Sequence, residues 1–153
     1  MTRLSSAFGD KYQSQAIRTK TFVLGGHTFK VRVPLSKEME ELQERVNKID
    51  EAEAKRRFDK MTASFRGEPI EGVVISEDDV IVEGRSTKEL VNTVLTVESR
   101  IVEYIKLLVP ETGNFDGLTY EEVEAEWPMS VQLELLSSIS EAIQPGYKDS
   151  RKN

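Results

Sequence analysis

A Gly-Gly pair lies between two short segments rich in β-branched and aromatic residues, Thr21–Leu24 and His27–Val33. Two successive glycines supply the positive φ angles that a two-residue hairpin turn of the primed type demands. Pairing residues outward from this turn sets Phe22 opposite Phe29, and both strands then agree on which face is apolar. The sequence therefore predicts a β-hairpin over about residues 20–33 with one buried face.

Good helix formers fill residues 36–65, which are expected to be helical. Apolar residues form two stripes at helical spacing. The first stripe is Met39, Leu42, Val46 and Ile49, and the second is Phe58, Met61 and Phe65. The step from Ile49 to Phe58 is about two and a half turns, which puts the stripes on opposite faces of a straight helix. Either the helix bends near residues 50–54, or each half packs on a different partner.

A second helix is predicted over about residues 87–109. It begins at a capping box formed by Ser86 and Glu89. Its apolar residues recur at helical spacing, which makes it the expected centre of the core. They are Leu90, Val94, Val97, Ile101, Ile105 and Leu108.

Shorter elements complete the expected fold. Residues 72–83 hold two β-branched runs, a possible second short hairpin. A capping box predicts a helix over residues 120–126, and apolar periodicity predicts another over residues 128–143. The fold class is therefore α+β, mainly helical, with a β-hairpin and about four helices.

The length of 153 residues favours one domain. We expect a single globular domain over residues 19–146. Residues 1–18 are polar and aperiodic and are expected to form a flexible arm. The charged residues 147–153 are expected to form a flexible tail.

The net charge of −6 is unevenly distributed. Residues 1–33 are rich in Lys and Arg, whereas residues 68–83 and 107–147 contain neither. Duplex nucleic acid requires clustered cations, so we expect no nucleic-acid partner. The distribution fits a basic protein partner or the basic N-terminal end of a second copy. It fits equally well an acidic surface that only maintains solubility.

No stretch approaches the roughly 18 apolar residues that cross a bilayer, so we expect no membrane partner. The N-terminus leads into no apolar run of the kind found in signal peptides. A cytoplasmic location is therefore the expectation.

The residues needed for most catalytic sites are scarce. The absence of Cys excludes a disulfide framework, a thiolate zinc site and a thiol nucleophile, and the single His excludes a multi-histidine metal site. His27 flanks the tight turn and is expected to be a strand-end residue. The acidic run 77–79 lacks the alternating ligands of a calcium loop. Glu53 and Asp59 are interleaved with the basic run 55–57 and Lys60, which favours a charged helix face. We therefore expect no enzyme activity, catalytic residue, metal, cofactor or small-molecule substrate.

The order of elements supports a family resemblance. A β segment over residues 21–34 opens directly into an acidic helix, and a helical centre follows. The C-terminal part runs from residues 120–128 into residues 133–139 and ends in Lys152-Asn153. This layout resembles the tail assembly chaperones of long-tailed bacteriophages (siphoviruses), small acidic proteins encoded just ahead of the tape measure protein.

The resemblance implies a non-enzymatic helper that binds the tape measure protein and recruits tail tube subunits. Such a protein works in the cytoplasm of the infected host and is absent from the mature virion. Members of the family are often made in two forms by programmed frameshifting, and a slippery heptamer would encode Lys152-Asn153. We also expect a homo-oligomer. The alternatives are a head–tail connector, a minor tail component or a small regulatory protein-binding domain.

A helper of this kind needs apolar surface and enough charge to stay dissolved while loaded. The stripe of Phe58, Met61 and Phe65 is the candidate partner-binding surface, because Met and Phe suit adaptable contacts with helices. The alternative is that both stripes of residues 36–65 are buried within the monomer. Trp127, the only tryptophan, is either a further partner-binding residue or the anchor of a helix junction.

Overall fold

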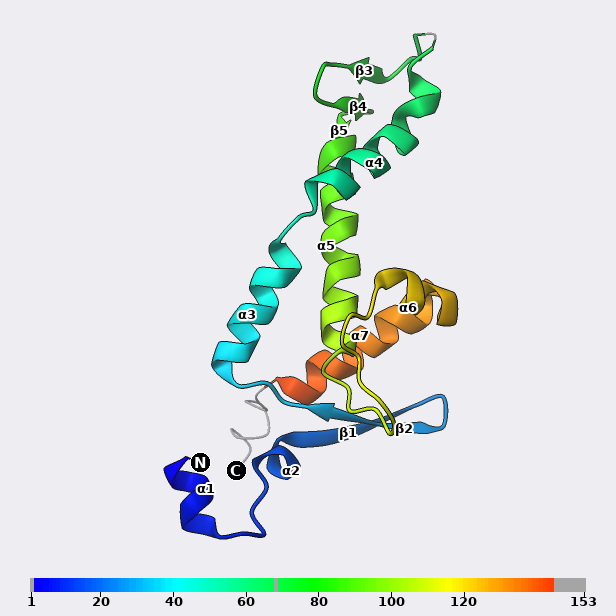
Figure 1. The fold of residues 1–153 in the computed structure, drawn as a ribbon. Coiled ribbons are helices and arrows are strands. Elements are labelled where there is room, and N and C mark those ends of the chain that lie inside the picture. The colour runs from blue at the N-terminus through cyan, green and yellow to red at the C-terminus, as the bar shows by residue number, and fades with distance from the viewer. Residues whose placement is uncertain (1, 68, 145–153) are drawn as a thin grey trace, which may run out of the picture. The chain divides into compact units, whose positions relative to one another are not determined.

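The computed structural model describes residues 2–67 and 69–144 as helices with two small antiparallel sheets (Figure 1). This confirms the predicted α+β, mainly helical fold class. The helices are α1 (Arg3–Phe8), α2 (Ser14–Arg18), α3 (Ser36–Asn47), α4 (Glu51–Thr62), the 3₁₀ helix η1 (Ala63–Phe65), α5 (Thr87–Ile105), α6 (Tyr120–Glu126) and α7 (Met129–Ile143). The strands are β1 (Thr19–Leu24), β2 (His27–Arg32), β3 (Val73–Ile75), β4 (Val80–Val82) and β5 (Arg85–Ser86).

Where the sequence predicts one globular domain over residues 19–146, the described residues form two compact units. Those within Met1–Glu41 and Ile101–Asn153 make up unit 1, and Leu42–Arg100 make up unit 2. The boundaries fall inside α3 and α5, so no loop or composition change in the sequence marks them.

The predicted arm of residues 1–18 contains the short helices α1 and α2. Thr2 and Ser5 form a capping box at the start of α1, and the rings of Phe8 and Tyr12 lie 5.2 Å apart. Helices this short show no apolar periodicity, which is why the sequence does not predict them. The predicted tail of residues 147–153 lies outside the described residues.

The hairpin of unit 1 has the predicted register. β1 pairs with β2 antiparallel, with Leu24 opposite His27 across the Gly-Gly turn. Phe22 lies opposite Phe29, and their rings stack with centroids 5.3 Å apart. Both turn glycines have positive φ, 59° and 78°, as the primed turn requires.

The free edge of β2 pairs with a segment that the sequence assigns to the helix over residues 87–109. The N–H of Arg32 donates to the carbonyl of Leu107 at 2.9 Å, and the N–H of Val109 donates to that of Lys30 at 2.8 Å. The predicted end of the helix is therefore wrong: α5 stops at Ile105 because the following backbone groups bond to the strand.

The opposite side of the hairpin is covered by α7, which contacts both β1 and β2 (Figure 1). Val31, Leu135 and Ile139 have no exposed surface and lie at the centre of unit 1. The core of unit 1 also includes Ile101, Val102, Tyr104, Ile105, Leu107, Leu108 and Val123. The hairpin face that the sequence predicts to be apolar is thus the face against which the apolar side of α7 packs.

The single helix predicted over residues 36–65 is wrong, because the structure divides it into α3, α4 and η1. Asp50 is the N-cap residue of α4. Its Oδ1 accepts from the N–H groups of Ala52 and Glu53 at 3.1 and 3.2 Å, so the helix starts again directly after it. The first apolar stripe is inward-facing, with Leu42 and Val46 buried. The break lies at residues 48–50, just ahead of residues 50–54, where the bend alternative places it.

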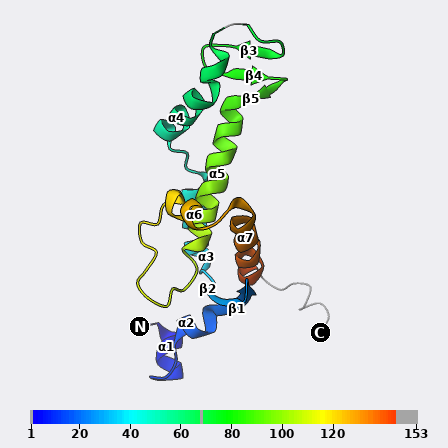
Figure 2. The ribbon, with the colours of Figure 1, turned by 90° about the vertical axis from the view of Figure 1, so that its right-hand side faces the viewer.

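The sheet of unit 2 contains the possible hairpin of residues 72–83 as β3 and β4, and adds the short β5 in the order β3-β4-β5. The sheet adjoins the N-terminal end of α5, with α4 beside the helix (Figure 2). Val80 and Val91 are buried in this unit, whereas Leu90 and Val94 are 50% and 38% exposed. The predicted core face of α5 is therefore wrong near its N-terminus, where Val91 points inward instead.

Candidate functional site

The predicted partner surface lies on α4 and η1, and its three residues are not equally accessible. Met61 is 44% exposed, while Phe58 and Phe65 are half-buried. Thr62 lies between them, is fully buried, and donates its hydroxyl to the Phe58 carbonyl at 2.7 Å. The inward face of α4 therefore passes through Thr62, and Met61 is the member of the stripe that remains on the outside.

A charged network fixes α4 against α5 beside this surface. The Arg57 guanidinium donates through Nη2 to Oε1 of Glu98 at 2.6 Å and through Nη1 to Oε2 of the same carboxylate. Its Nε donates to Glu53 at 2.9 Å, and Arg56 donates to that carboxylate through two nitrogens. The hydrogen bonds from Arg56 and Arg57 lower the pKa of Glu53 to about 2. The hydrogen bond to Glu98 raises the pKa of Arg57. Two residues of the basic run 55–57, Arg56 and Arg57, are therefore engaged in ion pairs within unit 2.

Trp127 lies at the junction of α6 and α7 and is half-buried. The backbone N–H of Trp127 donates to the backbone carbonyl of Val123 at 2.9 Å, and the backbone carbonyl of Trp127 accepts from Nε2 of Gln132 at 2.8 Å. Oε1 of Gln132, which is 1% exposed, accepts from the Tyr120 hydroxyl at 2.8 Å. These contacts fit the junction-anchor interpretation, and a partner contact through the remaining exposed part of the indole stays a prediction.

The acidic run of residues 77–79 has a structural task. The carboxylate of Asp79 accepts from the hydroxyl of Ser86 and from the N–H groups of Val80 and Lys88, at 2.8 and 3.0 Å for the latter two. These bonds, led by the one from Ser86, lower the pKa of Asp79. Asp79 thus joins the β3–β4 turn to the start of α5. Among residues 2–67 and 69–144, no group of three His, Asp or Glu side chains is placed to hold a metal ion.

A hollow of about 260 Å³ lies in unit 1, lined in part by Thr19, Arg32, Lys106 and Asp116. The Nε of Arg32 is buried there without a hydrogen-bond partner in the described part of the chain. Since that atom is shielded from solvent, it is also shielded from a ligand in the hollow. His27, the only histidine, is exposed and packs edge-on against Phe29 with centroids 4.6 Å apart.

Unit 2 exposes further apolar side chains that the sequence interpretation missed. They are Ile70, Val74 and Ile75 near and on β3, together with Leu90 and Val94 on α5. Val74 is 63% exposed and Ile75 is 51% exposed. For Val74 and Ile75, the signal that could have found them is a β-branched run between acidic residues, a pattern that edge strands use.

No protein-family model, curated protein or solved structure matches the chain. The resemblance to tail assembly chaperones accordingly rests on the layout of the sequence. Within the described ranges, none of the helices combines the length and the apolar character that crossing a membrane requires.

Proposed function

We propose that this protein is a non-enzymatic tail assembly chaperone of a long-tailed bacteriophage. In this role it binds the tape measure protein and recruits tail tube subunits in the cytoplasm of the infected host. It acts by non-covalent protein binding, as a homo-oligomer, and is absent from the mature virion.

The observation that carries the proposal is the amount of apolar side chain that unit 2 leaves exposed on an acidic chain. Its exposed large apolar residues are Met61, Ile70, Val74, Ile75, Leu90 and Val94. A protein that holds a long helical polypeptide needs apolar contacts of this kind, and the net charge of −6 favours solubility of the loaded complex. Large contiguous apolar patches on a protein surface mark interaction sites.

Phe58, Met61 and Phe65 are the residues proposed to contact the tape measure protein. Met61 offers the flexible, polarisable side chain that adapts to different partner helices. The half-buried rings of Phe58 and Phe65 flank it on the same helical stretch. Trp127 is proposed as a second contact, through the part of its indole that the α6–α7 junction leaves exposed.

The proposal is tested by co-expressing the chain with the tape measure protein encoded in the same genome and measuring how much of the latter stays soluble. M61S alone should reduce capture, and F58S/M61S/F65S should abolish it. The matched control is L4S/F8S/I17S, which removes three exposed apolar side chains from residues 1–18. The proposal fails if the control lowers capture as much as the test variant.

Two further measurements separate the alternatives. Circular dichroism and urea unfolding of the triple variant decide whether Phe58 and Phe65 are core residues, in which case the fold is lost along with binding. Mass spectrometry of purified mature virions decides between a chaperone, which should be absent, and a head–tail connector or minor tail component, which should be present.

A further inference from the structure

The strand β3 has an open edge in unit 2. The sheet order is β3-β4-β5, so within residues 2–67 and 69–144 β3 is paired on one side only (Figures 1 and 2). It carries three β-branched apolar residues in a row, of which Val74 and Ile75 are mostly exposed. An edge of this kind is a template for another strand unless charges or coverage block it.

The hydrogen bonds at both ends of β3 show which backbone groups face outward. The N–H of Glu83 donates to the Gly72 carbonyl at 2.8 Å, and the N–H of Ser76 donates to the Asp79 carbonyl at 2.9 Å. Because bonded pairs alternate along an antiparallel ladder, Val74 also bonds to β4, and Val73 and Ile75 direct their backbone groups away from it. The N–H of Val73 donates to Ile70, which leaves the Val73 carbonyl and both groups of Ile75 facing outward.

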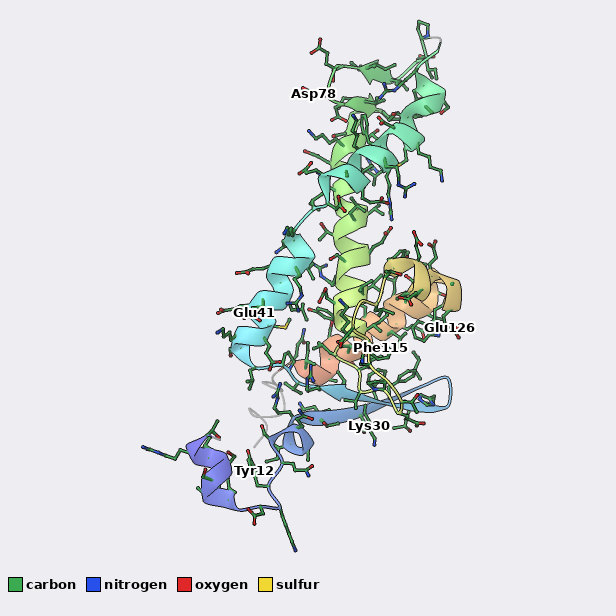
Figure 3. The ribbon with its side chains drawn as sticks, in the orientation of Figure 1. Tyr12, Lys30, Glu41, Asp78, Phe115 and Glu126 are labelled. Atoms are coloured by element: carbon green, nitrogen blue, oxygen red, sulfur yellow. The ribbon has the colours of Figure 1, made fainter. Side chains whose placement is uncertain are left out.

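The charged residues between 68 and 83, which include β3 and β4, are all acidic. Glu71, Glu77, Asp78 and Glu83 are exposed at the ends of β3 and β4, and residues 68–83 include no Lys or Arg. Asp78 lies at the outer end of the β3–β4 turn (Figure 3). The nearest basic residues in sequence are Arg66, which forms an ion pair with Asp59 at 3.6 Å, and Arg85, which is on β5, across the sheet from β3.

We propose that the β3 edge binds an extended segment of another protein in which Val or Ile alternates with Lys or Arg. Such a segment adds a strand beside β3, bonding to the outward groups of Val73 and Ile75. Alternation sends its apolar residues to the face that Val74 exposes, and the long basic side chains reach the carboxylates at both ends.

A second copy of this chain fits the edge less well. Pairing two β3 edges in the antiparallel direction would bring Glu71 of one copy near Glu77 of the other. Pairing them in parallel would bring identical carboxylates together. Like charges directly opposite each other destabilise a strand pair, so the charge pattern selects a basic partner. Both the proposed function and this inference use the exposure of Val74 and Ile75. The inference does not rest on the proposed function, because its binding contacts involve neither Phe58, Met61, Phe65 nor Trp127.

The test uses the full chain labelled with ¹⁵N and a synthetic peptide, acetyl-Lys-Val-Arg-Val-Lys-Ile-Arg-amide. Binding should shift the amide signals of Val73 and Ile75, slow hydrogen exchange at Ile75, and weaken as salt is raised. A peptide with Glu in place of each Lys and Arg should not bind. The inference is overturned if both peptides bind equally, or if neither shifts β3 at millimolar concentration.

Two variants locate the site. I75P removes the outward N–H and should abolish binding, with unchanged amide signals in α5 showing that the unit is still folded. E71K/E77K should weaken binding about threefold to tenfold, as expected for two exposed charge contacts. E121K/E124K, with the same change of net charge on α6, is the control. An equal loss in this control overturns the inference, as does a concentration-dependent dimer that I75P dissolves, because a second copy would then be the occupant.

Discussion

The guanidinium of Arg57 on α4 donates to both carboxylate oxygens of Glu98 on α5, with Nη2 lying 2.6 Å from Oε1. Glu98 is buried, and solvent reaches 28% of the Arg57 side chain. A carboxylate in such a position is tolerated because it is paired, since burying an isolated charge is costly. The pair therefore fixes where α4 packs on α5.

We expect R57M to lower the free energy of unfolding by about 2 kcal/mol, because it leaves the Glu98 carboxylate buried without this guanidinium. This is less than the roughly 3–5 kcal/mol typical of a fully buried pair, since Arg57 is partly solvated. Urea unfolding followed by circular dichroism measures the change. R56M, one residue away and 63% exposed at the side chain, should cost no more than about 0.5 kcal/mol. Equal effects of the two variants would contradict the special role of Arg57.

Acid should weaken the same network through Glu53. Hydrogen bonds from Arg56 and Arg57 lower the pKa of Glu53 from 4.5 to about 2 in the folded chain. Because the folded pKa is the lower one, the stabilisation is complete above about pH 4.5 and is lost as the pH falls toward 2. E53Q should be less stable than the parent chain by about 1 kcal/mol at neutral pH, given partial exposure. That difference should shrink between about pH 4.5 and 2 in urea unfolding, and a constant difference would contradict the assignment.

Features set by neighbouring residues could be predicted from the sequence, and features set by distant ones could not. The hairpin register follows from two glycines and the alternation around them, all within one short segment. The pairing of Arg32 with Leu107 joins residues far apart in sequence. No local pattern therefore predicts that α5 ends at Ile105, ahead of this pairing. The two stripes offer a bend near residues 50–54 as one of two alternatives, but the break lies at residues 48–50 and residues 51–54 are helical. The sequence does not locate the break, because Asp50 is one acid among many in that charged stretch.

The candidate site shows the same division. Periodicity grouped Phe58, Met61 and Phe65, yet which of them is exposed depends on which face of α4 is buried, and that face is the one that carries Thr62. Leu90 and Val94 fit a helical stripe but are exposed, whereas Val91 is the residue that is buried at this end of α5. The open edge of β3 depends on the sheet order. The turn after β4 brings β5 to the far side of β4, so β3 stays at the edge.

The junction of α6 and α7 depends on the buried Gln132, which accepts from Tyr120 and donates to the Trp127 carbonyl. We expect Q132L to cost about 2 kcal/mol, because it removes both bonds inside a buried site. Trp127 is the only tryptophan, so its fluorescence reports on this junction and should shift to the red. L133A, at a neighbouring side chain that is 47% exposed, should change neither stability nor emission appreciably. Unchanged emission in Q132L would mean that Gln132 does not hold Trp127 in place.

The turn between β4 and β5 offers a stabilising change. Glu83 and Gly84 form a two-residue loop with φ values of 49° and 81°, and Glu83 is the only non-glycine residue with positive φ in the described ranges. Asn adopts this left-handed conformation far more readily than Glu. E83N should therefore raise the free energy of unfolding by about 0.5–1 kcal/mol, measured by urea unfolding. E77N makes the same change of charge at an exposed residue without positive φ and should have little effect, so that an equal gain would assign the benefit to charge and not to backbone strain.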